Sequence, residues 1–598
     1  MSLLRLASLA SVVLLSSVLT WSQTHGGGGG HPGPPPPVRT GGNSGRTAPS
    51  PSGSGFPGST PFHTADEEGK IEFRTQAILV QVPVVITDKS GNHIHGLTKD
   101  DFHIFENGKE QKLSTFEEIV ATNAKLPVVA AKPGEFTNLT LSEQQPRSVT
   151  VIALDTVNTP FLDQTYGRRE LVKYLANSLE SGQVFALMII TSHGLKVVQG
   201  LTGDSAHLMD ILKKTGGEVS ALQTVGTDAQ ADAATGDIPG PPILISQGAD
   251  PAAAMADFVE RGDAIYAQFQ QQNAIETTMN AFRGIAWALS GIPGRKSLIW
   301  ATGGFPFVIG SPSTVPGGYL STLYERAMEA LSDANISVYP VDVRGLVNTS
   351  PISDMSARVR TGADLARQIN NRSWLQQSSI DTLNEFAEMT GGKAFYNTND
   401  LASSFKRAAD DASSYYLAGY YLDTHNNNAG WRQLKVKVDK KNTEVRARKG
   451  FFVTNATIHL EMTRDSDMSY ALTSPIEGTG VPISVKWAGV TGDGEKKKAI
   501  FMAQMPVNGL AFDSGEQNKL NFDFAAMAFN NKDGKVAGQV AVNFAKPISE
   551  AQVAAVRATG VGFRNALELG PGSYTVRFVV RDNVTGKVGS VTAPLTVN

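Results

Sequence analysis

The sequence has 598 residues, which at roughly 150 residues per domain predicts three to four domains. Its 53 basic and 56 acidic residues give a net charge of −3, which excludes the strongly basic surface that would bind nucleic acid or an anionic membrane. The chain has no cysteine, which excludes disulfides, thiolate metal sites, iron–sulfur clusters and cysteine nucleophiles.

The N-terminal 22 residues have the pattern of a secretory signal peptide. Arg5 precedes an uncharged apolar run over residues 6–19, and a small-x-small cleavage pattern ends at Ser22. The run is too short to span a hydrocarbon layer of about 30 Å. Residues 23–66 are rich in Gly, Pro and Ser, which predicts a disordered tether. We therefore expect an exported protein without an integral membrane span, located in the periplasm, at the outer surface or outside the cell.

Residues 67–126 predict an N-terminal β module. Short β-rich runs are separated by turn signals at residues 88–92 and at Asn107-Gly108, and Asn-Gly is the strongest short hairpin signal. These strands are too few to bury a sheet face alone, so we expect them to join strands predicted within residues 422–456. Residues 127–145 read as a linker, in which Asn138 begins an Asn-Leu-Thr glycosylation sequon.

Residues 148–421 alternate between strand and helix patterns. Continuous apolar β runs are typical of strands that are buried on both faces, and alternation with helices predicts a doubly wound α/β sheet. Two stretches, near residues 215–251 and 343–373, read as loop insertions. The predicted strands are residues 149–154, 184–190, 195–199, 296–301, 336–341 and 393–396, and the predicted helices are residues 162–179, 204–214, 252–289, 320–334, 380–389 and 401–412.

Residues 457–598 predict a C-terminal Ig-like β-sandwich. Alternating strands are separated by Gly- and Asp-containing turns, and one helical pattern covers residues 550–557. Together with the N-terminal module, the fold class is α/β with flanking all-β, sandwich-like modules.

Nine segments within residues 73–453 carry a resemblance to a known family. They are residues 84–91, 96–102, 105–108, 154–159, 292–297, 338–345, 390–392, 415–420 and 446–451. Together these segments resemble the VWFA-related proteins of the acidobacterial type. The resemblance covers about two thirds of the chain and implies a von Willebrand factor type A domain of Rossmann-like topology, preceded by a β module. Type A domains chiefly bind proteins, so the resemblance implies an interaction or adhesion role.

The resemblance also implies a candidate metal site. Type A domains commonly hold Mg²⁺ through an Asp-x-Ser-x-Ser loop after the first strand, a Thr from a second loop and an Asp after the fourth strand. In this chain Asp155 and Thr159 match the first and last loop positions, whereas Val157 replaces the middle Ser and Gly303 stands at the place of the later Asp. The second-loop Thr has four candidates, Thr202, Thr215, Thr224 and Thr227.

Asp155 has an alternative role, which is to cap the following helix or to brace its own loop. Asp342 ends a predicted strand at the same sheet edge, where it could substitute as a metal ligand or cap the loop that it opens. Because Asp155 is the only anionic ligand among the matched positions, we expect any Mg²⁺ to bind weakly. A zinc site at His93, His95 and His103 is disfavoured because no fourth ligand is evident.

Three functions remain open at this stage. The first is a non-enzymatic, exported interaction or adhesion protein whose α/β domain presents a degenerate metal site to an unknown protein partner. The second is a cell-envelope hydrolase that uses carboxylates around Asp155 and Asp342. The sequence contains no recognisable set of nucleophile, base and orienting residue, which favours the first over the second. The third is a structural envelope component without a specific partner.

Overall fold

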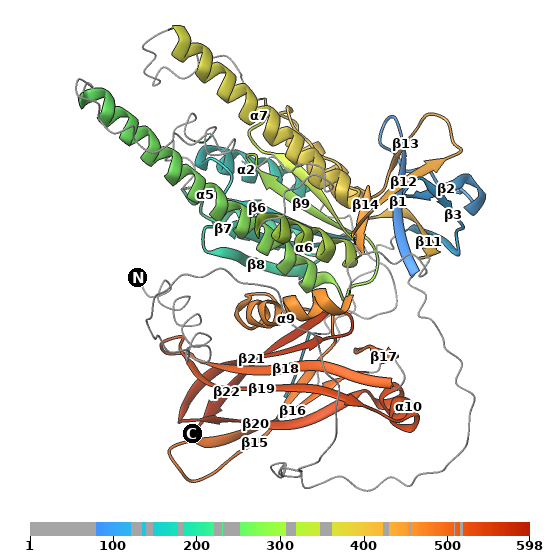
Figure 1. Ribbon diagram of the computed structural model, residues 1–598, viewed down its shortest axis with the longest axis vertical. Helices are drawn as coiled ribbons and strands as arrows, with labels where there is room; N and C mark the ends of the chain where they lie inside the picture. The colour runs from blue at the N-terminus through green and yellow to red at the C-terminus, as the bar shows by residue number, and fades with distance from the viewer. Residues whose placement is uncertain are drawn as a thin grey trace, which may run out of the picture. The chain divides into compact units, whose positions relative to one another are not determined.

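The computed structural model describes residues 79–120, 134–138, 148–177, 183–219, 230, 251–305, 319–346, 362–422, 430–453, 456–506, 509–514 and 518–598 (Figure 1). The predicted signal peptide (1–22), the predicted tether (23–66) and residues 67–78 of the predicted N-terminal module lie outside this set. Ala77–Asn598 form one compact unit.

A five-stranded sheet lies at the centre of the α/β part. Its strand order is β10-β9-β6-β7-β8, in which the first four strands are parallel and β8 is antiparallel to β7. β6, β9 and β10 are buried along their whole length, as the continuous apolar runs predicted. The strands are β6 (Val149–Asp155), β7 (Val184–Thr191), β8 (Gly194–Thr202), β9 (Lys296–Thr302) and β10 (Ile336–Asp342).

Helices cover both faces of this sheet. One hydrophobic core joins the sheet to α5, α6 and α7, and a second core joins its other face to α2, α3 and α8. The part is therefore mixed α/β with a layer of helices on each side, as the alternation of patterns predicted. The helices are α2 (Phe161–Asn177), α3 (Ser205–Lys214), α5 (Pro251–Leu289), α6 (Tyr319–Asp333), α7 (Gly362–Thr390) and α8 (Leu401–Asp410).

Two four-stranded sheets form a β module from both ends of the α/β part. Their orders are β13-β1-β11-β4 and β14-β12-β2-β3, and they share one apolar core. The early strands β1 and β2 pair with the late strands β13 and β12, so the two segments that were expected to join are hydrogen-bonded. The strands are β1 (Leu79–Asp88), β2 (Phe102–Glu106), β3 (Lys109–Gln111), β4 (Thr115–Val120), β11 (Ser414–Tyr421), β12 (Gly430–Val438), β13 (Thr443–Arg446) and β14 (Gly450–Val453); a 3₁₀ turn, η1 (Lys99–Asp101), precedes β2.

The hairpin predicted at Asn107-Gly108 is present between β2 and β3. Glu106 pairs with Lys109 across it, and Asn107 and Gly108 have φ values of 48° and 82°. A two-residue turn with positive φ at both positions matches the right-handed twist of the flanking strands, and this is why Asn-Gly occurs there.

The C-terminal part is a sandwich of two antiparallel sheets around a shared core. One sheet has the order β20-β16-β15-β5, and the other contains β17, β18, β21 and β22 with β19 paired to β18. The elements are β15 (Ser484–Thr491), β16 (Lys497–Met505), β17 (Phe512–Ser514), β18 (Asn518–Asn530), β19 (Val536–Pro547), α10 (Glu550–Thr559), β20 (Val561–Leu569), β21 (Gly572–Asp582) and β22 (Val588–Val597).

Three predicted boundaries were wrong. The predicted linker contains β5 (Glu135–Thr137), which pairs with β15 of the C-terminal sandwich. β11 belongs to the β module because it pairs with β1 and β4, although the predicted α/β domain extended to residue 421. α7 begins at Gly362, whereas residues 343–373 were expected to be a loop.

One helix was not predicted at all. α9 (Ala456–Thr473) lies where only strands were expected, between the β module and the C-terminal sandwich. The buried face of α9 includes the polar residues Thr463 and Asp467. The sequence therefore lacks the apolar stripe by which an amphipathic helix is predicted. Among the described helices, none combines the length and apolar character that crossing a membrane requires.

Candidate functional site

The carboxyl ends of the parallel strands bring the predicted site residues to one edge of the central sheet. Asp155 ends β6, and Asp342 ends β10, where it pairs in register with Thr302 at the end of β9. Asp155 and Asp342 are both almost completely buried. This is the edge at which open α/β sheets bind ligands, so the position of these residues fits a site.

Asp155 accepts five hydrogen bonds from groups of this chain. Oδ1 accepts the backbone N–H of Val157 and of Asn158, each at 3.0 Å. Oδ2 accepts Asn158 Nδ2 at 2.8 Å, Trp300 Nε1 at 2.9 Å and the Thr302 hydroxyl at 3.0 Å. Burial raises the pKa of Asp155, and these bonds oppose that shift. The carboxylate is therefore a brace of its own loop, which was one of the two predicted roles.

The positions that would complete a type A metal site are not available to a cation. The Thr159 hydroxyl accepts the backbone N–H of Gly303 at 2.8 Å. A Cβ atom at Gly303 would lie 2.8 Å from Pro160 Cδ and 3.0 Å from the Thr159 Cα atom. Because such contacts are too short, a side chain at position 303 would push the 158–160 loop away.

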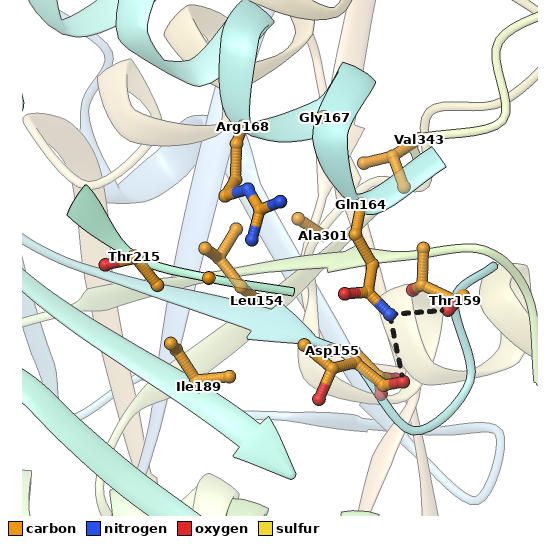
Figure 2. A pocket seen from close by; sticks show the side chains of 12 residues that line it. Leu154, Asp155, Thr159, Gln164, Gly167, Arg168, Ile189, Thr215, Ala301 and Val343 are labelled. Atoms are coloured by element: carbon orange, nitrogen blue, oxygen red, sulfur yellow. Dashed lines mark hydrogen bonds between the residues drawn. The ribbon is translucent and has the colours of Figure 1, made fainter. Parts of the chain in front are cut away.

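Gln164 of α2 holds this loop from the other side. Its amide nitrogen lies 2.8 Å from the carbonyl oxygens of Thr159 and Glu218 and 3.3 Å from that of Thr156, and its Oε1 accepts the Glu218 backbone N–H at 3.1 Å. Figure 2 shows Gln164 directed at the loop beside Asp155. The sequence did not single out Gln164, because an amide within a helix pattern has no local signal of its contacts.

The cavity next to Asp155 is very small. Its volume is about 20 Å³, which is enough for about one water molecule. Arg168 of α2 points into it in Figure 2, and burial lowers the pKa of this guanidinium. A positive group in the wall disfavours a second cation at the same place.

These residues do not fit a type A magnesium site. Mg²⁺ needs six oxygens in near-octahedral geometry, whereas the Asp155 oxygens and the Thr159 hydroxyl are already hydrogen-bonded. Asn158 Oδ1 is the one buried oxygen of the described loop without a hydrogen-bond partner. A single amide oxygen cannot supply the six oxygens that the ion needs.

Asp342 is engaged by its own loop. Its carboxylate accepts the Arg344 backbone N–H at 3.0 Å, and Arg344 Nε and Nη2 at 2.9 and 2.7 Å. Asp342 therefore caps the loop that it opens and is neutralised by a bidentate arginine. Both sheet-edge carboxylates thus accept hydrogen bonds that hold the loops following β6 and β10.

The other predicted ligands lie apart from Asp155 or serve local structure. The Thr202 hydroxyl accepts the Asp204 backbone N–H at 3.1 Å, and the Thr215 hydroxyl donates to Ile211 O at 2.9 Å, although Thr215 also lines the small cavity. Thr224 and Thr227 lie outside the described residues. In the described part of the chain, no group of three His, Asp or Glu side chains is placed to hold a metal ion. His95 and His103 instead contact Glu118 and Glu110 at 2.8 and 2.7 Å.

A much larger groove opens beside the same edge. Its volume is about 660 Å³, and it lies between the β7–β8 turn, residues 218–219, α5 and α9. Among the described residues that line it, the charged ones are the carboxylates Glu218 and Glu276, and none is Lys or Arg. The remaining lining residues are mainly amides, hydroxyls and small apolar groups, and they include Ser192, His193, Gln270, Asn273, Thr277, Asn280, Tyr470 and Thr473.

Glu218 links the groove to the sheet edge. It accepts hydrogen bonds from the hydroxyls of Thr156, at 3.1 Å, and of Ser192.

Comparisons of the chain with protein-family models and with curated proteins found no match.

Proposed function

We propose that the protein is an exported, non-enzymatic interaction protein of the adhesion type, built on a von Willebrand type A-like domain whose metal site is degenerate. The observation that carries this proposal is the hydrogen bonding of Asp155, because five donors of the chain replace the ligand shell of a cation. The mainly parallel sheet with helices on both faces and the signal-like N terminus support the same proposal.

The binding site that we propose is the 660 Å³ groove beside the sheet edge. Its size is within the range of ligand pockets, and its lining combines hydrogen-bonding groups with small apolar surfaces. The described part of its wall has two carboxylates and no Lys or Arg, so it favours a neutral or basic peptide segment of the partner. An envelope hydrolase is less well supported because Asp155 and Asp342 both serve loop structure.

The experiment is affinity capture from an envelope extract with the full chain, in parallel with two arginine variants of α5. Asn273 is exposed and lines the groove, whereas the neighbouring Gln272 is exposed and lies outside it. We expect Asn273→Arg to lose a captured partner that Gln272→Arg retains, and we expect the capture to persist in EDTA. Capture that needs Mg²⁺, or that is equal in both variants, would overturn the proposal.

A further inference from the structure

Glu218 lines the groove at the end that adjoins the sheet edge, and its backbone is held on both sides. Gln164 Oε1 accepts the Glu218 backbone N–H at 3.1 Å, and Gln164 Nε2 donates to the Glu218 carbonyl oxygen at 2.8 Å. The Glu218 side chain keeps 32% of its surface exposed. The groove therefore has a carboxylate at a fixed place in its wall.

Two hydroxyls contact this carboxylate, but they do not satisfy it fully. Ser192 donates its proton to Glu218 Oε1. The Thr156 hydroxyl lies 3.1 Å from Glu218 Oε2 and 2.8 Å from the carbonyl oxygen of Ile190. A hydroxyl has one proton to donate, so two acceptors share it and the nearer carbonyl takes the larger part. Oε2 therefore has room for another donor.

No Lys or Arg of the described residues forms an ion pair with Glu218. The nearest ionisable nitrogen is His193 Nδ1, at 3.9 Å from Oε1. Since Ser192 gives its proton to Glu218, its oxygen accepts from His193 Nδ1 at 3.1 Å. Residues 220–250, which follow in the sequence, contain four Asp and no Lys, Arg or His. The charge of Glu218 is thus left for a cation from elsewhere.

The α5 wall of the same groove suits the backbone of a peptide. Gln270, Asn273 and Thr277 recur at steps of three and four residues, so they share one face of the helix, and all three line the groove. Among the described residues, none is a hydrogen-bond partner of these three side chains. Amide side chains both donate and accept, as peptide bonds do. This face can therefore bind an extended segment of any sequence, whereas Glu218 selects for charge.

The geometry of Glu218 favours arginine over lysine. An ionised carboxylate has about four acceptor sites, and the two hydroxyls approach one on each oxygen. About one site remains on each oxygen. A guanidinium can donate two parallel N–H bonds to such a pair of oxygens, whereas an ammonium acts as a point charge.

We propose that the partner segment carries an arginine whose guanidinium binds the Glu218 carboxylate, while the amides of α5 bind the backbone around it. This inference rests on the proposed function, because it assigns a recognition rule to the same groove. It goes further in that it names the one side chain by which the groove distinguishes its ligands.

The test uses short random peptides displayed on phage and selected on the full chain. We expect the selected peptides to share one arginine. For a synthetic peptide of this kind, fluorescence anisotropy should show binding at least about tenfold weaker to Glu218→Gln than to the unaltered chain. Replacing the arginine by citrulline, its neutral isostere, should weaken binding to the unaltered chain to a similar degree and leave the protein untouched. Gln272→Arg, outside the groove, is the control and should bind as the unaltered chain does.

The combination of both changes is the decisive measurement. If arginine and Glu218 contact each other, Glu218→Gln should bind the arginine and citrulline peptides equally well. Peptides that need the groove, and so are lost in Asn273→Arg, but show no preference for arginine over lysine or citrulline would overturn this inference and leave the proposed function standing. Selection of no peptide, or of peptides that bind Asn273→Arg unchanged, would overturn both.

Discussion

At the scale of single residues, Asp155 shows how a carboxylate at a sheet edge can serve as a structural anion. Trp300, Thr302 and Asn158 all direct donors at it, so each of its oxygens is satisfied without solvent or metal. In Asp155→Asn, an amide nitrogen replaces one carboxylate oxygen. This nitrogen cannot accept hydrogen bonds from the donors that face it. Removing one member of such a buried network leaves the others unsatisfied.

We therefore expect Asp155→Asn to lower the free energy of unfolding by about 2–4 kcal/mol, measured by urea denaturation. Asp210→Asn is the control, because Asp210 is exposed and makes only a 3.9 Å contact with Lys213. An unfolding free energy equal to that of the unaltered protein would mean that the network contributes nothing to stability.

A second residue-scale prediction concerns the attempt to restore the metal site. Gly303→Asp should bind Mg²⁺ no more tightly than the unaltered chain in a calorimetric titration, because its Cβ atom collides with Pro160 and displaces Thr159. Gly303→Ala should be destabilised to a similar degree, since the collision begins at Cβ. Micromolar Mg²⁺ binding by Gly303→Asp would show that the loop can open and that the site is recoverable.

Lys296 makes stability depend on pH. Its Nζ donates to Ile292 O at 2.5 Å, and burial lowers the pKa of this amine from 10.5 to about 7. Between pH 7 and 10.5 the unfolded chain binds more protons at this lysine than the folded chain, so stability rises with pH. Lys296→Met should remove this slope. From pH 7 to pH 9 we expect the unaltered protein to gain roughly 2 kcal/mol relative to the variant, measured by urea unfolding.

At the scale of elements, the segment before the α/β part is tied to the C-terminal sandwich. The Asn138 side chain is buried; its Nδ2 donates to Gly478 O and Val481 O at 2.6 and 2.9 Å, and its Oδ1 accepts the Ile483 backbone N–H at 2.9 Å. A side chain with all of these bonds is not accessible to a glycosylating enzyme, so the sequon at Asn138 cannot be used in the folded protein.

We expect Asn138→Leu to destabilise the protein by about 2–4 kcal/mol in urea unfolding, because three buried backbone groups lose their partner. Glu135→Gln is the matched control in the same segment. Its 3.4 Å ion pair with Lys486 is partly exposed and contributes little. If both variants lose the same small free energy of unfolding, the hydrogen bonds of Asn138 do not stabilise the attachment of this segment.

The sequence predicted elements well where apolar periodicity is strong and poorly where polar residues are buried. β6, β9 and β10 were expected within one residue of their observed ends, because strands buried on both faces are continuous apolar runs. α9 buries Thr463 and Asp467, and β5 has only three residues, so neither has a periodic signal.

The candidate site could likewise be predicted only in part from the sequence. The place of Asp155 and Asp342 at one sheet edge follows from strand order, which a sequence pattern can predict. The contacts of Asp155 with Trp300 and Thr302 depend on the tertiary neighbours of β6, which no local pattern contains.

At the scale of the whole molecule, a buried ion network joins the α/β part to the C-terminal sandwich. Asp467 of α9 lies 2.8 Å from Arg283 of α5 and 3.2 Å from Arg581 of β21, and all three side chains are almost fully buried. The Arg283 guanidinium also lies 5.1 Å from the Trp287 ring centroid. One carboxylate thus compensates two buried arginines.

We expect Asp467→Asn to separate the calorimetric unfolding of these two parts and to cost about 3–5 kcal/mol, since it removes the carboxylate that pairs with two buried arginines. Asp465→Asn, on the exposed side of α9, should leave a single transition. Two transitions already present in the unaltered protein would show that the parts unfold independently.

The β module can be completed only late in synthesis of the chain. β1 and β4 pair with β11, and no residue of β11 exists until the ribosome reaches position 414. At about 5–20 residues per second, the early strands wait roughly 15–60 s for that partner. During this time their edges are unpaired, and unpaired edges are sites of aggregation. The sheet that contains β1 and β4 is therefore completed only after residues 414–421 have been synthesised.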